Sequence, residues 1–535
     1  MSGIYFWITV LFIVQLFTQN TFAQDLSATG FFNRCYTQLT GKPVPLNHAL
    51  MSKVKSGDIS AIDACIQILH KGQLTTSGPL TTPGDPESRA VLNNFYTFHR
   101  TWFATNNVNS IQGYSAGEQN GTGDVFDASE PALSVTYSLF FPGQKYSDTL
   151  TRATGVHAIR SEDNTIAARM KWKSAFPGRY LIDDPMMANS VFSFRATATT
   201  PTEVNRNINK HISSKLNVPN IEVGNLIGIR ATIESLVVPN LSLSPLGNTN
   251  TDKGSLYADK LNYSYDLYKN LGGGILGSPI YILENLGHGF DMKFNGQTKV
   301  ARRWSQANMN SFLCANLPSL REMDVQKFVD PTSSAPFRNG TSCVMCHATL
   351  DQMAYTLRNV TVGATDYFLP NLDGDVTIDA SGKQVNPPRA NVRTSISITT
   401  YKSLNESVTG WPTEPVTDFH LQKPTGRLYF RSLTGTLIDK PLNGVADLGQ
   451  ALSDTDDYYL CAAKRYFEFM TGIQVPLYDR TDPKNADLNK NLTATAIDDR
   501  KFIETLAANL RSSGSIMLMI EDIIKSNYYK KENYR

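Results

Sequence analysis

The apolar positions of this chain recur mostly at intervals of three and four residues, which predicts a mainly α-helical protein. The interval is clearest in residues 90–104, where Val91, Leu92 and Phe95 fall on one side of a helix. The same spacing marks further segments at residues 45–70, 130–141, 225–236, 302–313, 350–360, 458–471 and 501–525.

Glycine, proline and short polar residues mark where the helical pattern is interrupted. They dominate residues 112–126, 197–209 and 239–250, which we expect to be loops. After residue 368 the composition shifts toward Asp, Thr, Val and Ile, and Asp373-Gly374 and Ser381-Gly382 are typical of hairpin turns. The predicted fold is therefore mainly α, with some loop and β-hairpin insertions.

Residues 343–347 spell C-x-x-C-H, the pattern by which a chain binds haem c covalently. Cys343 and Cys346 would form thioethers with the porphyrin vinyl groups, and His347 would be the proximal iron ligand. With six cysteines and eight histidines in 535 residues, chance gives this pattern in about one such chain per thousand. The alternatives are a disulfide across the two cysteines or a zinc site, but zinc needs about four ligands and no second pair has metal-ligand spacing. The motif predicts one covalent haem c.

The second axial position of the iron would decide what such a haem can do. A Met ligand gives a high potential, a second His gives a lower one, and an open position allows small-molecule binding or peroxide chemistry. Met353 lies on the same expected helix as His347, so it cannot easily reach the opposite side of the haem. His420 and Met470 are the best candidates from elsewhere, ahead of Met309 and His288, although each is also an ordinary core or surface residue.

Three arginines are candidates for pairing with the haem propionates through charge-assisted hydrogen bonds. Arg338 is the best placed, because it lies five residues before Cys343. Arg302 and Arg303 are the others, and ordinary surface exposure is the alternative for all three. The second ring nitrogen of His347 is expected to donate to a backbone carbonyl, which would fix the tautomer.

The N-terminus has the features of a secretory signal peptide. Residues 4–17 form an apolar run, and Thr21-Phe22-Ala23 is a small-x-small cleavage site, which predicts export and removal of residues 1–23. The first residues carry no Lys or Arg, which departs from the usual pattern. A lasting membrane anchor is the alternative, although the run is shorter than the about 20 residues of a spanning helix. We expect a periplasmic or cell-envelope location.

The four cysteines outside the motif fit an oxidising compartment. We favour pairing Cys35 with Cys65, which closes a short loop, and Cys314 with Cys461, which links the segment before the motif to a later helix. Buried free thiols are the alternative, above all for the second pair, which is far apart in the sequence.

Four segments follow one another in a recognisable order: residues 272–279 with their triple glycine, 302–313, 343–351 and 458–470. This order resembles bacterial envelope proteins with a planctomycete-type cytochrome c module. Together the four segments cover roughly residues 272–473. Two departures are Leu317–Asp324 with its single Pro318, in place of a Pro-rich stretch, and Thr471-Gly472-Ile473 at the end of the late helix. The resemblance implies an exported, mostly helical, haem-bearing protein and supplies no activity.

Length and the motif together suggest a division into domains. We expect a signal peptide at residues 1–23, a helical N-terminal domain at 24–270, a cytochrome c-like haem-binding segment at 271–365, and a C-terminal helical domain with a hairpin-rich start at 366–535.

Charge and motifs limit the possible functions. The 50 Lys and Arg residues nearly balance the 48 Asp and Glu residues and are dispersed, which gives no argument for a nucleic-acid partner. The basic, Tyr-containing end of the chain is expected to be a frayed tail. Electron transfer to an unknown redox partner is the leading hypothesis, with peripheral membrane or envelope association possible. The alternatives are a haem enzyme of the peroxidase or oxidase type, and an envelope binding protein with a structural haem.

Overall fold

The computed structural model describes residues 24–103, 130–160, 226–231, 263–264, 271–278, 281–282, 285, 298–334, 336–358, 360–366, 392–399 and 423–534. Within these ranges the chain is mainly helical, which confirms the predicted class. Several predicted features lie outside the described residues: the signal peptide, the loop at 112–126, the turns at Asp373 and Ser381, and the candidate ligands His288 and His420.

The N-terminal part is a set of capped helices. Asp85 caps α5, and Pro86 occupies its first turn, so the helix begins before the predicted residue 90. The helical segment predicted at 45–70 is present as two helices, because Gly57 ends one at φ 80° and Ser60 caps the next. The helices are α2 (Ala28–Thr40), α3 (Ala49–Ser56), α4 (Ala61–His70), α5 (Pro86–Arg100), α7 (Glu130–Phe140) and α8 (Asp148–Thr151).

A short antiparallel pair of strands lies beside these helices. Strand β2 (Leu226–Ala231) pairs with β1 (Val156–Arg160), with Val156 opposite Ala231. The helix predicted at 225–236 is therefore wrong over this strand. A short apolar run with β-branched residues fits either element, and pairing with a distant strand decides it here.

The central part carries the C-x-x-C-H motif. Its long helices are α15 (Thr298–Leu313) and α18 (Thr341–Ala354), and the motif lies in the first turns of α18. The short elements are η2 (Gly274–Gly277), α16 (Glu322–Val325), η3 (Gln326–Phe328), α17 (Pro336–Asn339) and η4 (Tyr355–Leu357). A sheet of order β3-β5-β4 is formed by Tyr263–Ser264, Val392–Thr399 and Val360–Asp366.

The C-terminal part combines one hairpin with a helical block. The helical block predicted at 501–525 is confirmed, and it consists of two helices, because Gly514 ends α24 at φ 71° and Ser515 caps α25. The elements are β6 (Thr425–Arg431), β7 (Leu437–Asn443), α21 (Val445–Ser453), α22 (Asp456–Thr471), η5 (Pro483–Asn485), α23 (Ala486–Lys490), α24 (Ala494–Ser513), α25 (Ile516–Lys525) and α26 (Asn527–Lys530).

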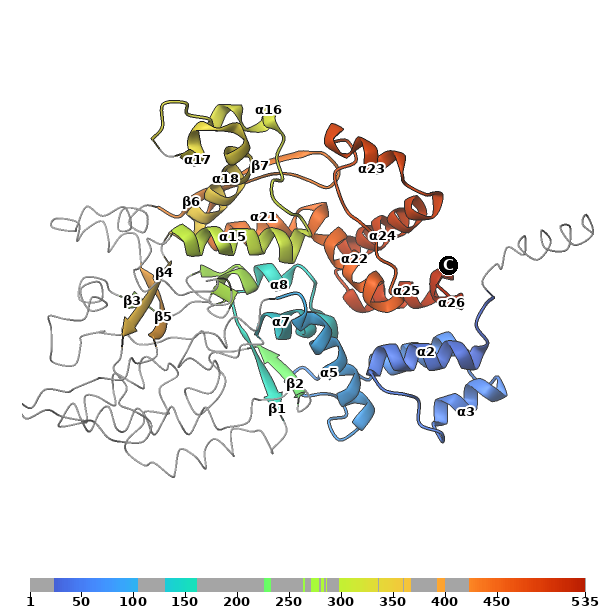
Figure 1. The fold of residues 1–535 in the computed structure, drawn as a ribbon. Coiled ribbons are helices and arrows are strands. Elements are labelled where there is room, and N and C mark those ends of the chain that lie inside the picture. Colours follow the sequence, from blue (N-terminus) through green and yellow to red (C-terminus); the bar gives the residue numbers. More distant parts are fainter. Residues whose placement is uncertain are drawn as a thin grey trace, which may run out of the picture.

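One buried core runs through the described residues, from Phe31 on α2 to Tyr529 on α26. The N-terminal helices, α15 and the C-terminal helices all contribute to it, so the segments expected as separate domains share this core. Figure 1 shows α22 and α25 beside the N-terminal helices, although they are far apart in the sequence.

The end of the chain is ordered, which contradicts the frayed tail expected from its sequence. Tyr529 is fully buried, and Leu26 donates its backbone N–H to the carbonyl of Lys530 at 2.9 Å. Arg34 also donates to the carbonyl of Lys531, and its guanidinium lies 3.9 Å from the ring centre of Tyr534. The tail therefore forms part of the packing of α2.

Both expected cysteine pairs stand as disulfides. Cys35 and Cys65 join α2 to α4, with their Cα atoms 6.0 Å apart. Cys314 and Cys461 join the residue after α15 to α22, with their Cα atoms 5.2 Å apart. In the part of the chain that the structure describes, no helix is long and apolar enough to cross a membrane.

Candidate haem-attachment site

One face of α18 carries the three reactive side chains of the motif and is open to solvent. At 3.6 residues per turn, Cys343, Cys346 and His347 fall within about 100° of one another around the helix. Cys343 is exposed, Cys346 and His347 are partly exposed, and the two thiols are free. The opposite face is buried and consists of Val344, Met345, Ala348 and Thr349.

A small second core supports the buried face of α18. Tyr429 of β6 is buried there and donates its hydroxyl to the carbonyl of Asp324 at 2.6 Å. β6 passes so close to α18 that a Cβ on Gly426 would lie 2.2 Å from the carbonyl oxygen of Gln352. The apolar members of this second core are Leu320, Val325, Val344, Met345, Ala348 and Tyr429. The second core therefore packs on the face of α18 opposite to the motif side chains, and the face that carries them stays exposed to solvent.

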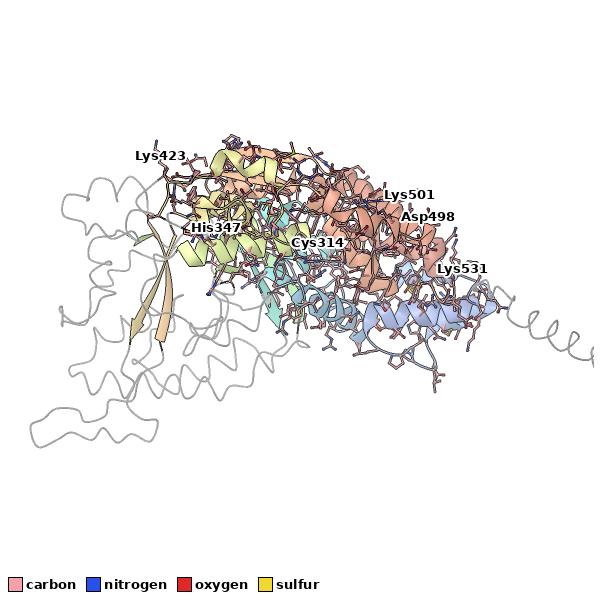
Figure 2. All side chains as sticks on the ribbon, turned by 45° about the horizontal axis from the view of Figure 1, so that its top comes forward. Cys314, His347, Lys423, Asp498, Lys501 and Lys531 are labelled. Carbon is pink, nitrogen blue, oxygen red and sulfur yellow. A yellow bond between two sulfur atoms is a disulfide. The ribbon has the colours of Figure 1, made fainter. Side chains whose placement is uncertain are left out.

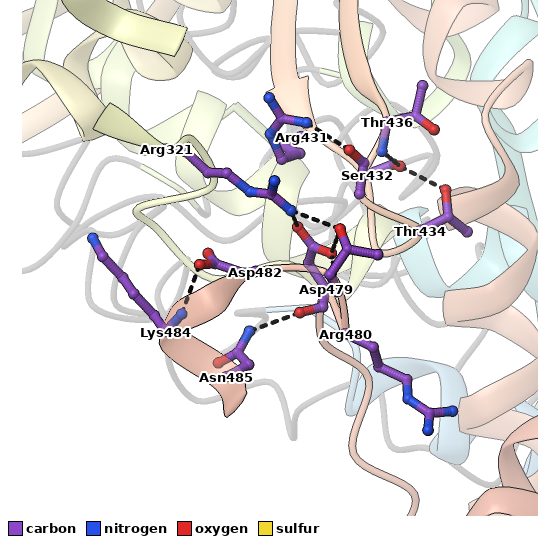
Figure 3. A network of polar contacts seen from close by, with 12 residues as sticks. Arg321, Arg431, Ser432, Thr434, Thr436, Asp479, Arg480, Asp482, Lys484 and Asn485 are labelled. Carbon is purple, nitrogen blue, oxygen red and sulfur yellow. Dashed lines mark hydrogen bonds and ion pairs between the residues drawn. The ribbon is translucent and has the colours of Figure 1, made fainter. Parts of the chain in front are cut away.

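Charge-assisted hydrogen bonds join α16 to β6, the strand that packs on the buried face of α18. Arg431 of β6 donates to both carboxylate oxygens of Asp324, at 2.5 and 2.9 Å. Burial alone would raise the pKa of Asp324, but the bonds from Arg431 and from the backbone N–H of Arg321 outweigh it and hold that pKa below its usual value. Figure 3 shows Arg321 reaching across to Asp479, 2.5 Å away, in the loop after α22.

The His347 ring is held by Phe337 and Asp351. Phe337 of α17 stacks on the imidazole, with ring centres 4.6 Å apart and planes 25° from parallel. Nδ1 lies 3.4 Å from each carboxylate oxygen of Asp351, one turn further along α18. The expected backbone carbonyl partner is therefore wrong, because the acceptor is a carboxylate. No described residue bonds to Nε2, the nitrogen that would face the iron.

Asp351 is itself held by Arg302 of α15. Arg302 Nε lies 2.5 Å from Oδ1 and Nη2 lies 3.0 Å from Oδ2, a two-pronged ion pair. The guanidinium also lies 5.0 Å from the ring centre of Phe337. Figure 2 shows His347 near the N-terminal half of α15 and Cys314 at the other end of that helix.

The two motif cysteines differ in environment. Burial, followed by the neighbouring Cys343, raises the pKa of the Cys346 thiol. Cys343 projects into solvent and is accessible to a reacting vinyl group. Within the described ranges, no three His, Cys, Asp or Glu side chains gather in an arrangement that would hold a metal ion.

The methionines considered as second axial ligands are buried in the main core. Met353 accepts a hydrogen bond from Asn308 Nδ2, 3.6 Å from its sulfur, and Met309 is fully buried on α15. Met470 is fully buried near the end of α22, where Gln38 of α2 donates to the neighbouring Phe469 carbonyl. α2 and α18 lie at different ends of the molecule (Figure 1), so the structure does not bring Met470 to His347.

The candidate propionate partners occupy different positions. Arg338 is exposed on α17, with its guanidinium 5.8 Å from the Phe337 ring centre, beside the open face of α18. Arg303 is also exposed, whereas Arg302 is engaged by Asp351. The role of Arg338 as a propionate partner stays a prediction.

Two residues of the site went unnoticed in the sequence. Asp351 stands four positions after His347, and the i, i+4 geometry of a helix could have indicated their contact. Phe337 lies on a separate short helix, and no local pattern places it on the imidazole.

Comparison with known proteins yields no relative. No protein-family model, no curated protein and no solved structure matches this chain. The function has to be inferred from the geometry of α18 and its neighbours.

Proposed function

We propose that this chain is an exported c-type cytochrome protein with a single covalent haem, which transfers electrons in the bacterial cell envelope. One observation carries the proposal: two free thiols and an imidazole share the open face of α18, with Nδ1 held by Asp351 and Nε2 without a partner among the described residues. This is the arrangement that haem c attachment requires.

The residues of the site fit the group on chemical grounds. A haem bound there would supply reversible one-electron chemistry at its iron. Cys343 and Cys346 would anchor the group, and His347 would coordinate it through Nε2. Asp351 orients the imidazole by accepting from Nδ1, and Phe337 covers one face of its ring. The buried face of α18 keeps these groups fixed relative to one another.

The proposal extends to compartment and organisation. Residues 1–23 direct export, and the two disulfides are consistent with an oxidising compartment. Residues 271–365 form a cytochrome c-like segment between the N-terminal region and the C-terminal helices. This assignment agrees with the resemblance to planctomycete-type cytochrome c modules. The partner is a redox protein of the envelope.

A haem enzyme with an open iron position is the second candidate. One observation favours it: Met309, Met353 and Met470, the described methionines considered as second ligands, are all packed in the core. An iron coordinated only by His347 would bind small ligands such as peroxide.

An absorption spectrum tests both candidates. The protein is produced with a haem c maturation system, and the reduced-minus-oxidised spectrum is recorded with and without carbon monoxide. A sharp reduced spectrum that carbon monoxide leaves unchanged supports electron transfer, whereas a carbon monoxide shift supports the enzyme. Absence of covalent haem contradicts both.

Matched variants make the assignment specific. Cys343→Ala with Cys346→Ala should abolish covalent attachment, whereas Cys35→Ser with Cys65→Ser should retain it. His347→Ala should keep the thioether bonds but lose the low-spin spectrum. An unchanged low-spin spectrum in His347→Ala would remove this residue from the coordination of the iron.

A further inference from the structure

We infer that Asp351 and Arg302 set the redox potential of the haem in opposite directions: Asp351 lowers it through His347, and Arg302 limits that lowering. The inference rests on the proposed function and deepens it, because it assigns a positioning role, exerted through His347, to two residues that the proposal does not use to bind the cofactor.

The geometry forms a chain of three side chains from two helices. His347 Nδ1 lies 3.4 Å from both oxygens of Asp351, which is a long hydrogen bond. Arg302 grips the same two oxygens from α15, at 2.5 and 3.0 Å. The side chains are only 27, 14 and 26 % exposed for His347, Asp351 and Arg302, so water screens the interaction less than it does at an open surface.

A carboxylate acceptor changes the imidazole more than a carbonyl does. Coordination through Nε2 would leave the proton on Nδ1, where it points toward Asp351. A negatively charged acceptor makes the imidazole a stronger electron donor and adds negative charge near the iron. Both effects stabilise the ferric state relative to the ferrous state, which lowers the midpoint potential.

Arg302 acts in the opposite direction. Its guanidinium neutralises part of the Asp351 charge and competes with Nδ1 for the same oxygens. Without Arg302, the whole negative charge of the Asp351 carboxylate would act on His347, and the midpoint potential should fall further. Phe337 packs against both His347 and Arg302, so the three groups are held in one geometry.

Midpoint potentials that shift in opposite directions in the two variants would distinguish this electrostatic role from a general loosening of the site. Potentials are measured by optical redox titration of the holoprotein for the unchanged chain, Asp351→Asn and Arg302→Gln. Asp351→Asn should shift the ferric–ferrous equilibrium about tenfold toward the ferrous state, which is about 59 mV upward for one electron. Arg302→Gln should shift the potential downward. A site that is merely loosened by either change would move both potentials in the same direction.

A control removes a nearby carboxylate that does not touch His347. Asp330→Asn alters an exposed residue just before α17 and should leave the potential unchanged. Asp351→Glu keeps the negative charge, so its midpoint potential should stay closer to that of the unchanged chain than the potential of Asp351→Asn does.

The outcomes distinguish the inference from the function on which it rests. Covalent haem with no upward shift in Asp351→Asn, or with equal shifts in Asp351→Asn and Asp330→Asn, overturns the inference alone. An unchanged chain that binds no covalent haem overturns the proposed function and the inference together.

Discussion

The guanidinium of Arg431 lies 2.5 and 2.9 Å from the two carboxylate oxygens of Asp324 and thereby ties β6 to α16 behind the motif helix. The Asp324 side chain is 3 % exposed, so the pair is largely removed from water. The backbone N–H of Arg431 also donates to the carbonyl of Ser319 at 2.8 Å. The support of α18 therefore depends on a charge pair between two segments far apart in the sequence.

Removing one partner of this pair should be costly. Arg431→Met leaves the Asp324 carboxylate buried with less compensation, and the free energy of unfolding should fall by about 3 kcal/mol. Urea unfolding followed by circular dichroism measures the loss. Asp487→Asn, which removes an exposed carboxylate paired with Lys490, serves as the control and should leave the midpoint nearly unchanged. Equal midpoints for Arg431→Met and the unchanged protein would contradict the structural role of the pair.

A methyl group on Gly426 should disturb the motif helix directly. Its Cβ would lie 2.2 Å from the carbonyl oxygen of Gln352 on α18, so β6 and α18 would have to move apart. Gly426→Ala should therefore lower the free energy of unfolding by about 1–3 kcal/mol, the usual cost of overpacking. Gly340→Ala is a matched control, because nothing lies within 4 Å of a Cβ at that position just before α18. Thermal melts should show a lower melting temperature for Gly426→Ala than for Gly340→Ala. If only Gly340→Ala is destabilised, the close approach of β6 to α18 at Gly426 is contradicted.

Elements with strong local signals were predictable from the sequence. The apolar spacing of Val91, Leu92 and Phe95 predicts the body of α5, and these three residues are fully buried. The start of α5 at Asp85-Pro86 lies before the predicted residue 90. The C-x-x-C-H motif was expected on a helix and lies on α18. These predictions succeeded because each depends on residues a few positions apart.

The failures have a common physical cause, since each depends on distant parts of the chain or on backbone conformation. Ile229 belongs to a strand because β1, about 70 positions earlier, pairs with it. The ordered tail results from the contact of Tyr529 with α2, and Gly514 divides a continuous apolar pattern by adopting a positive φ. In the site, the contact of Phe337 with His347 could not be predicted, because Gly340 separates their helices and sets the angle between them.

The disulfide between Cys314 and Cys461 should stabilise the packing of α15 on α22. It closes a loop with a sequence separation of 147 residues. Cys314→Ser with Cys461→Ser should lower the free energy of unfolding by about 2–4 kcal/mol, and should leave the motif cysteines able to bind haem. Differential scanning calorimetry with and without reductant checks the effect. If reductant lowers the melting temperature of the unchanged protein and of this variant equally, the bond makes no such contribution.

The buried carboxylate of Asp457, near the start of α22, accepts the backbone N–H of Leu433 at 2.9 Å. Burial raises the pKa of Asp457 to about 7, although the Leu433 N–H opposes the shift. The folded protein therefore keeps a proton that the unfolded chain releases above about pH 4. This contribution to stability is present at low pH, falls as the pH rises from about 4 to 7, and is lost above the folded pKa.

Asp457→Asn should remove this dependence, because the amide oxygen still accepts from Leu433 and carries no titrating proton. The variant and the unchanged protein should have similar stability near pH 4, whereas at pH 8 the variant should be more stable by up to about 4 kcal/mol. Urea unfolding at several pH values measures the difference. Asp498→Asn, on the exposed side of α24, should instead give a curve parallel to that of the unchanged protein. A constant difference between Asp457→Asn and the unchanged protein at every pH would show that Asp457 does not retain its proton in the folded state.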